Sequence, residues 1–243
     1  MTAANEAAPL AGQVALVTGA SRGIGRAIAE RLELRGATVA TVQRGAGPGL
    51  SLRADLSSPE AAAAAVTEAV ERLGSLHICV HAAGVTARVP LLDLELDDWR
   101  RVIDLNLTAA FAVTTAAARQ FRRQDSGGAI LHVSSMLATF GGVGVAAYSA
   151  SKGGVEQLMR SQSNEWAELG IRVNAIAPGW IDTDFTAALR TDPTRGDEIT
   201  KRIPTGRWGT AEEVADAAEW LLGPKASYVT GSVVTVDGGY ASR

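Results

Sequence analysis

The sequence predicts a single α/β domain built on a doubly wound parallel sheet with helices on both faces. Short apolar runs alternate with helical patterns along the chain, and no linker interrupts them, which is typical of a parallel sheet with crossover helices. A chain of 243 residues is also long enough to bury a full core as one domain. We expect residues 1–10 to form a loose tail and residues 11–243 to form the domain.

The composition excludes several classes of protein. The net charge is −3 with both signs mixed along the chain, so no basic stripe indicates a nucleic-acid partner. Cys79 is the single cysteine, which excludes an internal disulfide framework and a cysteine-based zinc site. The first residues carry no basic segment followed by an apolar one, and no apolar run approaches the ~18 residues of a membrane span. We therefore expect a soluble, cytoplasmic protein with no membrane partner.

A glycine-rich stretch follows the first predicted strand. The apolar run Val14 to Val17 ends at Thr18, and Gly19-Ala20-Ser21-Arg22-Gly23-Ile24-Gly25 then leads into a helical pattern that ends at Gly36. Glycines permit a tight turn and close backbone approach, and a helix N-terminus presents free N–H groups to an anion. This order predicts a phosphate-binding loop at the first strand–helix junction. A purely structural turn is the alternative.

The second predicted strand, residues 38–42, bears on the choice of dinucleotide. An acidic residue at its end would hold a ribose 2′-hydroxyl and repel a 2′-phosphate. The chain has Gln43-Arg44 there instead, and Arg22 lies in the glycine loop. Two guanidinium groups without a carboxylate favour a 2′-phosphate. We therefore expect NADP rather than NAD, unless both arginines face water.

The middle of the chain continues the alternation. The elements expected there are a turn at 45–49, a strand at 50–53 leading to Ala54-Asp55-Leu56, a helix from Pro59 to about Leu73, a strand at 76–80 running into His81-Ala82-Ala83-Gly84, and a long helix from Asp97 to about Arg123. Asn106 falls inside this last helix, where asparagine is unfavourable, and so indicates a kink or a specific task. On propensity alone, a surface position is the simpler interpretation of Asn106.

The C-terminal half completes the sheet. We expect a strand at 129–133 ending in Ser134-Ser135, a glycine-rich loop at 141–144, a helix to about Gly170, a strand at 172–177 followed by Pro178-Gly179, a helix at 211–222 and a last strand at 232–236. Residues 180–205 read as irregular and hold Trp180, Phe185 and Leu189. An apolar segment beside a site excludes water when it closes, so we interpret residues 180–205 as a mobile flap.

One pair of side chains carries acid/base chemistry. Tyr148 and Lys152 are four residues apart, which places them on one face of a helix, one turn from each other. Lowering the pKa of a tyrosine from its usual value to about 7 costs about 4 kcal/mol. A cation about 4 Å away at an effective dielectric constant near 20 supplies an energy of that size. Lys152 is therefore expected to make Tyr148 a general acid/base, the alternative being an ordinary surface pair.

Taken together, the motifs resemble those of the short-chain dehydrogenase/reductase family over essentially the whole chain. The matching motifs are Thr18-Gly19-x-x-x-Gly23-x-Gly25, Asp55, Ala83-Gly84, Asn106, Ser135, Tyr148-x-x-x-Lys152 and Pro178-Gly179. The resemblance implies a Rossmann-type sheet of about seven strands, usually a homotetramer, and hydride transfer between a nicotinamide and a small-molecule alcohol or ketone. A catalytically silent dinucleotide sensor is the alternative from another class.

The resemblance also implies roles for individual residues. Asn106, Ser135, Tyr148 and Lys152 match the catalytic positions: Ser135 polarises the carbonyl, Tyr148 moves the proton, Lys152 tunes Tyr148 and binds the ribose, and Asn106 holds a relay water. The positions that match cofactor contacts are Gly19, Ser21, Arg22, Gly23, Ile24, Gly25, Arg44, Asp55, Leu56, Ala83, Gly84, Tyr148, Lys152, Pro178, Gly179, Ile181 and Thr183. His77 and His132 have no chelating partners in the pattern, so we predict no metal site.

One position departs from the family, which has Asn-Asn-Ala-Gly where this chain has His81-Ala82-Ala83-Gly84. The replacement puts local hydrogen bonding between strands in doubt rather than catalysis. We expect His81 to be a structural histidine with its hydrogen bonds satisfied, the alternative being titration near neutral pH.

Three blocks resemble the sugar-acid branch of the family, which includes 2-deoxy-gluconate 3-dehydrogenases and gluconate 5-dehydrogenases: residues 163–167, 173–180 and 202–209. Such blocks also occur in 3-oxoacyl-acyl-carrier-protein reductases. A carboxylate substrate needs a cation at the cleft mouth, and Arg88 is placed to provide one unless it is a solvated loop residue. An acyl carrier needs a basic patch, for which the candidates are Arg119, Arg122 and Arg123, diluted by Asp125 and Glu168.

Overall fold

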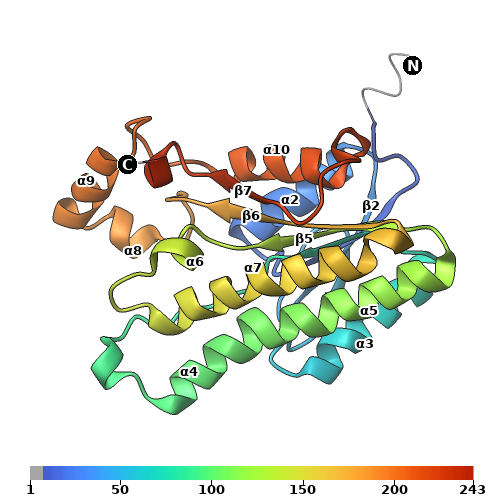
Figure 1. Cartoon of the computed structure of the whole chain (residues 1–243), viewed down its shortest axis with the longest axis horizontal. Helices are drawn as coiled ribbons and strands as arrows, with labels where there is room; N and C mark the ends of the chain where they lie inside the picture. Colours follow the sequence, from blue (N-terminus) through green and yellow to red (C-terminus); the bar gives the residue numbers. More distant parts are fainter. Residues whose placement is uncertain (1–7, 243) are drawn as a thin grey trace.

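A seven-stranded parallel sheet forms the centre of the computed structural model, which describes residues 8–242 (Figure 1). The strands are β1 (Val14–Thr18), β2 (Thr38–Gln43), β3 (Leu50–Arg53), β4 (Ile78–His81), β5 (Gly128–Val133), β6 (Ile171–Pro178) and β7 (Val233–Val236), in the order β3-β2-β1-β4-β5-β6-β7. The strand order reverses between β1 and β4, where a doubly wound sheet opens a crevice. The predicted fold class is confirmed.

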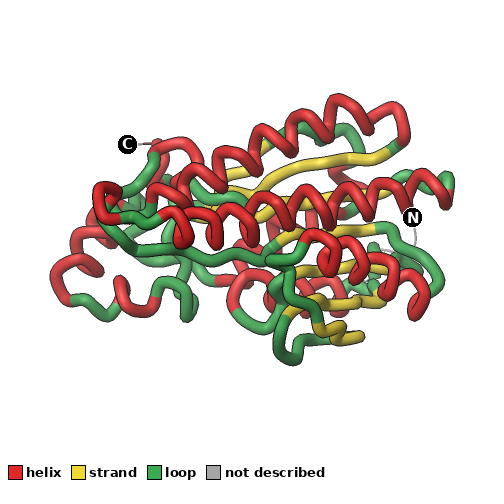
Figure 2. The backbone as a smooth tube through the Cα atoms, turned by 90° about the horizontal axis from the view of Figure 1, so that it is seen from below, coloured by secondary structure: helices red, strands yellow, loops and turns green. Residues whose placement is uncertain are grey.

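Helices cover both faces of the sheet. Figure 1 shows α2 (Gly23–Leu34) and α10 (Ala211–Leu222) on one face, and α3 (Pro59–Leu73), α5 (Ala109–Gln124) and α7 (Ala146–Trp166) on the other. Figure 2, seen from below, shows the second group lying side by side in front of the strands. In β1, Ala15 and Val17 pack into one core cluster and Val14 and Leu16 into the other, because successive side chains of a strand point to opposite faces.

Capping residues explain why several helices begin and end where the sequence predicts. The Ser58 side chain accepts a hydrogen bond from the Ala61 N–H, Pro59 occupies the first turn of α3, and Gly74 follows its end with φ 84°. Thr210 and Glu213 form a reciprocal capping box at the start of α10. These are strong local signals, and both helices have their expected bounds.

Strand β4 begins two residues later than expected. The Leu76 N–H donates to Oε1 of Gln124 at 2.9 Å, and its carbonyl accepts from Nε2 of the same side chain at 2.7 Å. A side chain from α5 therefore satisfies the backbone groups that a neighbouring strand would otherwise take. Leu76, the first residue of the apolar run that predicted a strand, thus pairs with a side chain of α5, whereas His77 already hydrogen-bonds to the Val14 carbonyl and the Ala129 N–H.

The predicted helix from Asp97 is interrupted. It consists of α4 (Leu96–Ile103), a π-helical turn at Asp104–Thr108, and α5. Asn106 lies in the π turn and is fully buried. The predicted irregularity is thus confirmed, and the alternative of a surface asparagine is wrong. Single π turns are concentrated at functional sites.

Residues 180–205 are not irregular as expected, since they contain α8 (Ala187–Arg190) and α9 (Pro193–Arg202). Asp192 caps α9 by accepting hydrogen bonds from the N–H groups of Thr194 and Arg195, a start signal that the sequence interpretation overlooked. In Figure 1 these helices lie at one end of the sheet beside α6 (Leu137–Phe140). Short 3-10 helices lie at Leu91–Asp93, Ala167–Leu169, Pro224–Ala226 and Tyr240–Ser242.

The N-terminal boundary of the domain lies earlier than residue 11. Leu10 is buried, and its N–H donates to the Arg35 carbonyl at 3.0 Å. The rest of the predicted tail, residues 1–7, lies outside the described residues. Within residues 8–242, no helix is both long enough and apolar enough to cross a membrane.

Candidate active site

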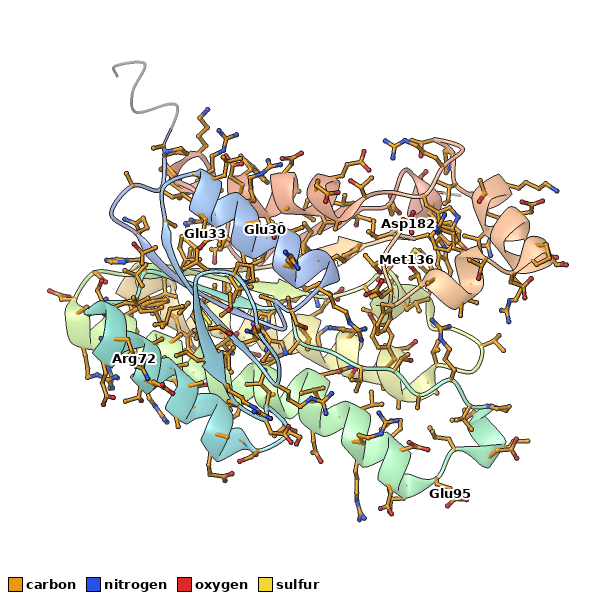
Figure 3. The ribbon with its side chains drawn as sticks, turned by 180° about the vertical axis from the view of Figure 1, so that it is seen from behind. Glu30, Glu33, Arg72, Glu95, Met136 and Asp182 are labelled. Carbon is orange, nitrogen blue, oxygen red and sulfur yellow. The ribbon has the colours of Figure 1, made fainter. Side chains whose placement is uncertain are left out.

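A cavity of about 1410 Å³ lies at the carboxyl ends of the strands. The loops that follow β1 to β6 form its walls, and residues of α9 close one side. In Figure 3, seen from behind, Met136 and Asp182 lie at this end of the molecule, far from Arg72 at the other end. Met136 directly follows Ser135, and its N–H donates to the Pro178 carbonyl at 3.2 Å. The loops after β5 and β6 are therefore tied together at the site.

The glycine loop leaves room only for glycine. A Cβ on Gly19, which has φ +69°, would lie 2.6 Å from the Ala83 Cα, and one on Gly25 would lie 2.5 Å from the Gly19 carbonyl oxygen. Arg22 occupies the N-cap of α2 but makes no side-chain cap hydrogen bond. The first N–H groups of α2 therefore face the cavity without a side-chain partner, which is an anion-binding geometry. This cradle fits a dinucleotide pyrophosphate.

The two predicted 2′-phosphate arginines both line the cavity. Arg44 is exposed at the end of β2, whereas Arg22 pairs with Asp184 across the cavity at 3.8 Å. The Gln43 Nε2 is already used, because it donates to the hydroxyls of Thr41 and Ser51. Arg44 is therefore the cation at this end of the cavity that the structure leaves without a carboxylate within 4 Å among residues 8–242.

The predicted adenine contact, Asp55, organises its own loop. Its Oδ1 accepts from the Ser57 N–H at 3.0 Å and from the Ser57 hydroxyl at 2.8 Å. These hydrogen bonds, together with the charge of Arg44, hold the pKa of Asp55 below its usual value. Leu56 is buried beside it, and both residues line the cavity.

The four predicted catalytic residues come together at one end of the cavity. Ser135, Tyr148 and Lys152 all line it. Asn106 lies just behind the wall, where a Cβ placed on Gly84 would be 3.4 Å from its Oδ1 and 3.6 Å from Lys152 Nζ. The π turn contributes Asn106, the loop after β5 contributes Ser135, and α7 contributes both Tyr148 and Lys152. Residues separated by up to 46 positions in the chain thus converge.

Tyr148 does not have the electrostatic environment that the sequence predicts. Burial raises its pKa, while the Ser135 hydroxyl and the Arg88 guanidinium act to lower it. Lys152 Nζ lies 5.7 Å from the centre of the Tyr148 ring and donates instead to the Val133 carbonyl at 2.7 Å. The expectation that Lys152 alone lowers the pKa of Tyr148 to about 7 is therefore not met. The ammonium is directed at a strand carbonyl rather than at the Tyr148 hydroxyl.

Lys152 is the most strongly desolvated cation of the site. Its side chain is 3% exposed, and burial lowers its pKa to about 8. One of its three N–H donors is used by Val133, so two remain for other partners. A buried ammonium with free donors at a cavity wall suits the binding of sugar hydroxyls.

Asn106 acts mainly as a brace. Its Oδ1 accepts from the Val85 N–H at 2.8 Å, and its Nδ2 donates to the Val85 carbonyl and the Ser151 hydroxyl, both at 2.9 Å. Both amide donors are thus occupied, and only one lone pair of Oδ1 is left for a water. Asn106 therefore connects the loop after β4 to the helix that carries Tyr148.

The predicted nicotinamide contacts follow β6. Pro178 and Gly179 end the strand, Ile181 is 3% exposed, and Thr183 lies opposite the glycine loop, 3.6 Å from the Cβ position of Gly23. The Phe185 ring centre is 5.8 Å from that of Tyr148. The segment after β6 therefore closes the cavity over both the glycine loop and Tyr148.

His81 is a structural residue. It is fully buried, and its Nδ1 lies 3.2 Å from the Thr18 hydroxyl, which itself accepts the N–H groups of Ala82 and Ala83. The Thr18 hydrogen is therefore donated to Nδ1, which leaves the proton of the neutral imidazole on Nε2. Burial and the charges of His132 and Lys152 hold the pKa of His81 well below its usual value, so titration near neutral pH is excluded. Thr18 supplies the hydrogen bonding that the His81 replacement put in doubt. The Nε2 of His81 is buried without a hydrogen-bond partner among residues 8–242, so the expectation of a fully hydrogen-bonded histidine is met only at Nδ1.

Several residues of the site carried no signal in the sequence interpretation. Glu156 is 7% exposed and accepts from the Ser134 hydroxyl at 2.8 Å. The cavity wall also includes Arg195, Arg202 and Tyr240. The spacing of Arg195 and Arg202, seven residues apart after a helix-starting Asp192-Pro193, could have indicated one face of a helix. No group of three potential metal ligands occurs within residues 8–242.

The fold and the residues gathered at its carboxyl edge define a dinucleotide-binding α/β enzyme. A family model described as "Enoyl-(Acyl carrier protein) reductase" matches residues 19–241. The 2-dehydro-3-deoxy-D-gluconate 5-dehydrogenase of Dickeya dadantii is 38% identical over 96% of this chain and 97% of its own length. The 3-oxoacyl-[acyl-carrier-protein] reductase FabG of Vibrio cholerae is 38% identical over 95% of this chain and 98% of its own.

Solved structures agree with these relatives. A protein of Agrobacterium tumefaciens assigned as a 2-deoxy-D-gluconate 3-dehydrogenase, with bound NADP, superposes with a TM-score of 0.91 at 40% identity, covering 96% of this chain and 98% of its own. One of Beutenbergia cavernae assigned as an NAD(P)-dependent gluconate 5-dehydrogenase, with NADP at low occupancy, gives 0.92 at 40% identity and the same coverage. The chain belongs to the short-chain dehydrogenase/reductase family and is an NAD(P)-dependent oxidoreductase.

Proposed function

We propose that this protein is an NADP-dependent oxidoreductase that interconverts a secondary alcohol and a ketone, with a sugar acid as its substrate. The convergence of Ser135, Tyr148 and Lys152 on one cavity that begins at the glycine loop carries the proposal. The two NADP-bound structures and the gluconate-type relatives support the cofactor and the substrate class.

The residues that would hold the dinucleotide fit it. The glycine cradle and the start of α2 would bind the pyrophosphate, Asp55 and Leu56 the adenine, and Arg44 with Arg22 a 2′-phosphate. Ala83, Gly84, Pro178, Gly179, Ile181 and Thr183 would line the nicotinamide half, together with Lys152. When bound, the dinucleotide supplies or accepts the hydride.

Each residue of the catalytic group contributes a separate task. The Ser135 hydroxyl donates a hydrogen bond to the substrate oxygen and so polarises the carbonyl. The Tyr148 hydroxyl passes a proton to that oxygen in reduction and takes it back in oxidation. Lys152 binds ribose hydroxyls through its two free donors. Asn106 keeps α7 in register with the loop after β4 and accepts one relay water at its remaining lone pair.

Cofactor preference has a direct test. Exchanging Arg44 for aspartate replaces a cation with an anion where the 2′-phosphate would lie, and a charge-assisted hydrogen bond contributes about 1.5–3 kcal/mol. We expect Arg44→Asp to raise the Kd for NADPH at least tenfold while the Kd for NADH falls, as measured by nucleotide fluorescence titration. A wild-type enzyme that already prefers NADH would contradict the assignment of Arg44.

Arg88 is proposed as a substrate contact near the reacting carbon. It lines the cavity, acts on the pKa of Tyr148, and has no carboxylate within 4 Å among the described residues. Arg88→Ala should raise KM for sugar acids while nucleotide affinity stays unchanged. An unchanged KM would contradict this assignment and indicate that Arg88 is a solvated loop residue.

The second candidate substrate is an acyl-carrier thioester, which the FabG relatives favour. The predicted docking cations do not support it. The helix α5 ends at Gln124 just before β5 begins at Gly128, so Arg122 and Arg123 lie near the amino ends of the strands, at the edge opposite the cavity. A carrier docked there would hold its thioester away from Tyr148. Comparing NADPH oxidation with β-ketoacyl thioesters and with keto sugar acids decides between the two classes.

A non-catalytic sensor is the alternative from another class. Such a protein would bind NADPH without turnover of any ketone or alcohol in a panel. The presence of all four catalytic positions around one cavity argues for an enzyme, because a sensor has no use for Tyr148 and Lys152 together.

We also propose that the protein is a cytoplasmic homotetramer. Large apolar side chains are exposed along the segment from the turn at Leu91–Asp93 through α4 to α5, at Leu91, Leu92, Leu96 and Phe111, and others are exposed at Trp220 on α10 and at Tyr228. A dimer needs one self-complementary patch, and a tetramer with two kinds of interface needs two. Light scattering should give four copies, and Leu92→Glu should give two. Cell fractionation tests the location.

A further inference from the structure

Six arginines line the cavity, and they differ in whether a carboxylate pairs with their charge. They are Arg22, Arg44, Arg88, Arg101, Arg195 and Arg202. Arg22 pairs with Asp184 at 3.8 Å, and Arg101 with Asp98 at 2.8 Å. Arg44 belongs to the nucleotide end. At the substrate end, Arg88, Arg195 and Arg202 have no carboxylate within 4 Å among residues 8–242.

Arg202 is held in place by an aromatic ring. Its guanidinium carbon lies 4.6 Å from the centre of the Tyr240 ring. The Tyr240 ring in turn meets that of Trp180 edge-on at 6.3 Å, and Trp180 lies 5.4 Å from Trp208. A guanidinium stacked on a ring keeps its N–H donors free at its edge. Arg202 is thereby oriented without losing its hydrogen-bonding capacity.

Glycines near the C-terminal end allow this stack. Gly238 and Gly239 have φ of +62° and +86°, and a Cβ on them would lie 2.5 Å from Thr205 Oγ1 and 3.0 Å from Pro204 Cγ. The Thr205 N–H also donates to the Gly238 carbonyl at 3.2 Å. The turn that carries Tyr240 is therefore packed directly against the residues that follow Arg202, and only glycine permits that contact.

Neighbouring arginines of the same segment have a different environment. Arg190 pairs with Asp182 at 2.8 Å and Arg207 pairs with Glu213 at 2.6 Å. Glu198 lies one turn before Arg202 on α9 and also lines the cavity, yet forms no ion pair with it within 4 Å. The segment thus neutralises its outward arginines and leaves the charge of Arg202 available to the cavity.

We propose that Arg202, oriented by Tyr240, binds the carboxylate of the substrate and so sets the preference for an acid. Arg88 lines the cavity from the loop after β4 and serves the reacting end of the substrate, whereas Arg202 lines it from α9. The planar fork of an arginine matches a carboxylate with two parallel hydrogen bonds. This inference rests on the proposed oxidoreductase function and specifies the part of the site that selects the substrate.

The test compares Arg202→Gln with Lys201→Gln. Lys201 is the adjacent cation of α9 and does not line the cavity, so its variant removes the same charge from the surface. The readout is the ratio of kcat/KM for a keto sugar acid to that for a neutral ketose of matched length, with NADPH. We expect Arg202→Gln to lower this ratio about 10- to 100-fold, mainly through KM, and Lys201→Gln to change it less than about twofold.

Two further variants separate orientation from charge. Tyr240→Phe keeps the stacked ring and should keep the ratio, whereas Tyr240→Leu should lower it about three- to tenfold, since the guanidinium becomes mobile. If Arg202→Gln fails to fold, Arg202→Lys, which keeps the charge but loses the planar fork, gives the same comparison. An unchanged ratio, or equal losses on the acid and the neutral ketose, overturns the proposal. A wild-type enzyme that turns over neither substrate contradicts the proposed function instead.

Discussion

Burial shifts the pKa values of the Tyr148 phenol and the Lys152 ammonium in opposite directions. Burial disfavours the charged form of each group, and so raises the pKa of Tyr148 and lowers that of Lys152 to about 8. Near neutral pH Tyr148 is therefore protonated, which suits a proton donor for ketone reduction. The hydrogen bond from Ser135 and the charge of Arg88 oppose this effect at the same hydroxyl.

Removing the Tyr148 hydroxyl should abolish chemistry while leaving the site assembled. General acid/base groups contribute about 10²- to 10⁴-fold to rate, so Tyr148→Phe should lower kcat by that factor. The Kd for NADPH should change less than about threefold, because the glycine cradle and α2 are untouched. Stopped-flow absorbance and fluorescence titration measure the two quantities. A loss of nucleotide binding equal to the loss of rate would contradict the assignment.

We expect the buried ammonium of Lys152 to lower the free energy of unfolding, although the group has a role in the site. Its pKa is lowered to about 8 in the folded chain, whereas an unfolded lysine titrates near 10.4. The unfolded state therefore binds more protons between these values, and stability rises with pH in that window. At pH 7, below both values, the buried ammonium costs about 3 kcal/mol. Lys152→Met should raise the urea midpoint at pH 7 and abolish activity, and a lower midpoint would disprove the cost.

At the scale of single elements, the site depends on two backbone irregularities. The π turn at Asp104–Thr108 turns the Asn106 amide inward, where it joins Val85 to Ser151. The glycine loop brings the start of α2 against the loop after β4, since Gly19 packs on Ala83. In both cases an unusual backbone conformation brings neighbouring elements into contact.

Two glycines with similar φ distinguish backbone strain from steric clash. Gly74 has φ +84° with nothing within 4 Å of a Cβ, whereas Gly19 has φ +69° with the Ala83 backbone 2.6 Å away. Gly74→Ala should cost about 1 kcal/mol from conformation alone. Gly19→Ala should cost clearly more and weaken NADPH binding, because the loop must move. Urea unfolding measures both, and equal costs would show that the contact with Ala83 is unimportant.

At the scale of the whole molecule, the sheet buries two histidines next to the site. His81 and His132 are register partners on β4 and β5, both fully buried, with ring centres 6.4 Å apart. Nε2 of His132 lies 2.9 Å from Oε1 of Gln162. The Nε2 of the same glutamine donates to the Thr114 hydroxyl. These contacts extend from the centre of the sheet to α5 and α7. Protonation of either ring would therefore place a charge in the core and lower the stability of the whole fold.

Acid should therefore destabilise the fold before the carboxylates titrate. Burial lowers the pKa of His132 to about 4 and that of His81 well below its usual value. Below pH ~6.5 the unfolded chain binds protons that the folded chain refuses, so stability falls as pH falls. His132 should cost about 2 kcal/mol at pH 5, and His81 adds to the loss in the same direction. Urea midpoints between pH 7.5 and 5 should decline, and less steeply in His132→Gln. A flat profile would contradict buried neutral rings.

The parts of the fold predicted from the sequence are those with local signals. The capping box at Thr210 and Glu213 and the Ser58-Pro59 start mark α10 and α3 within a few residues of chain. The motifs at Gly19, Ser135 and Tyr148 likewise mark the ends of strands and the start of a helix. Residues 193–202 were missed as a helix although Asp192 caps them, because their polar composition hides an apolar face.

Other features depend on contacts between distant segments. The direction of the Lys152 ammonium follows from the Val133 carbonyl, 19 residues earlier, and the burial of Asn106 follows from Val85 and Ser151, which lie 21 and 45 residues away. The start of β4 depends on Gln124. No pattern within a window of sequence contains these partners.

The sequence by itself determined the alternation of strands and helices, the glycine cradle and the residue types of the catalytic group, because periodicity, capping and glycine conformation act within a few residues. Only the tertiary structure decided the protonation preference of Tyr148, the bracing role of Asn106 and the stacking of Arg202 on Tyr240 at the cavity wall. Burial and hydrogen-bond partners determine these properties, and both arise when segments far apart in the chain pack together.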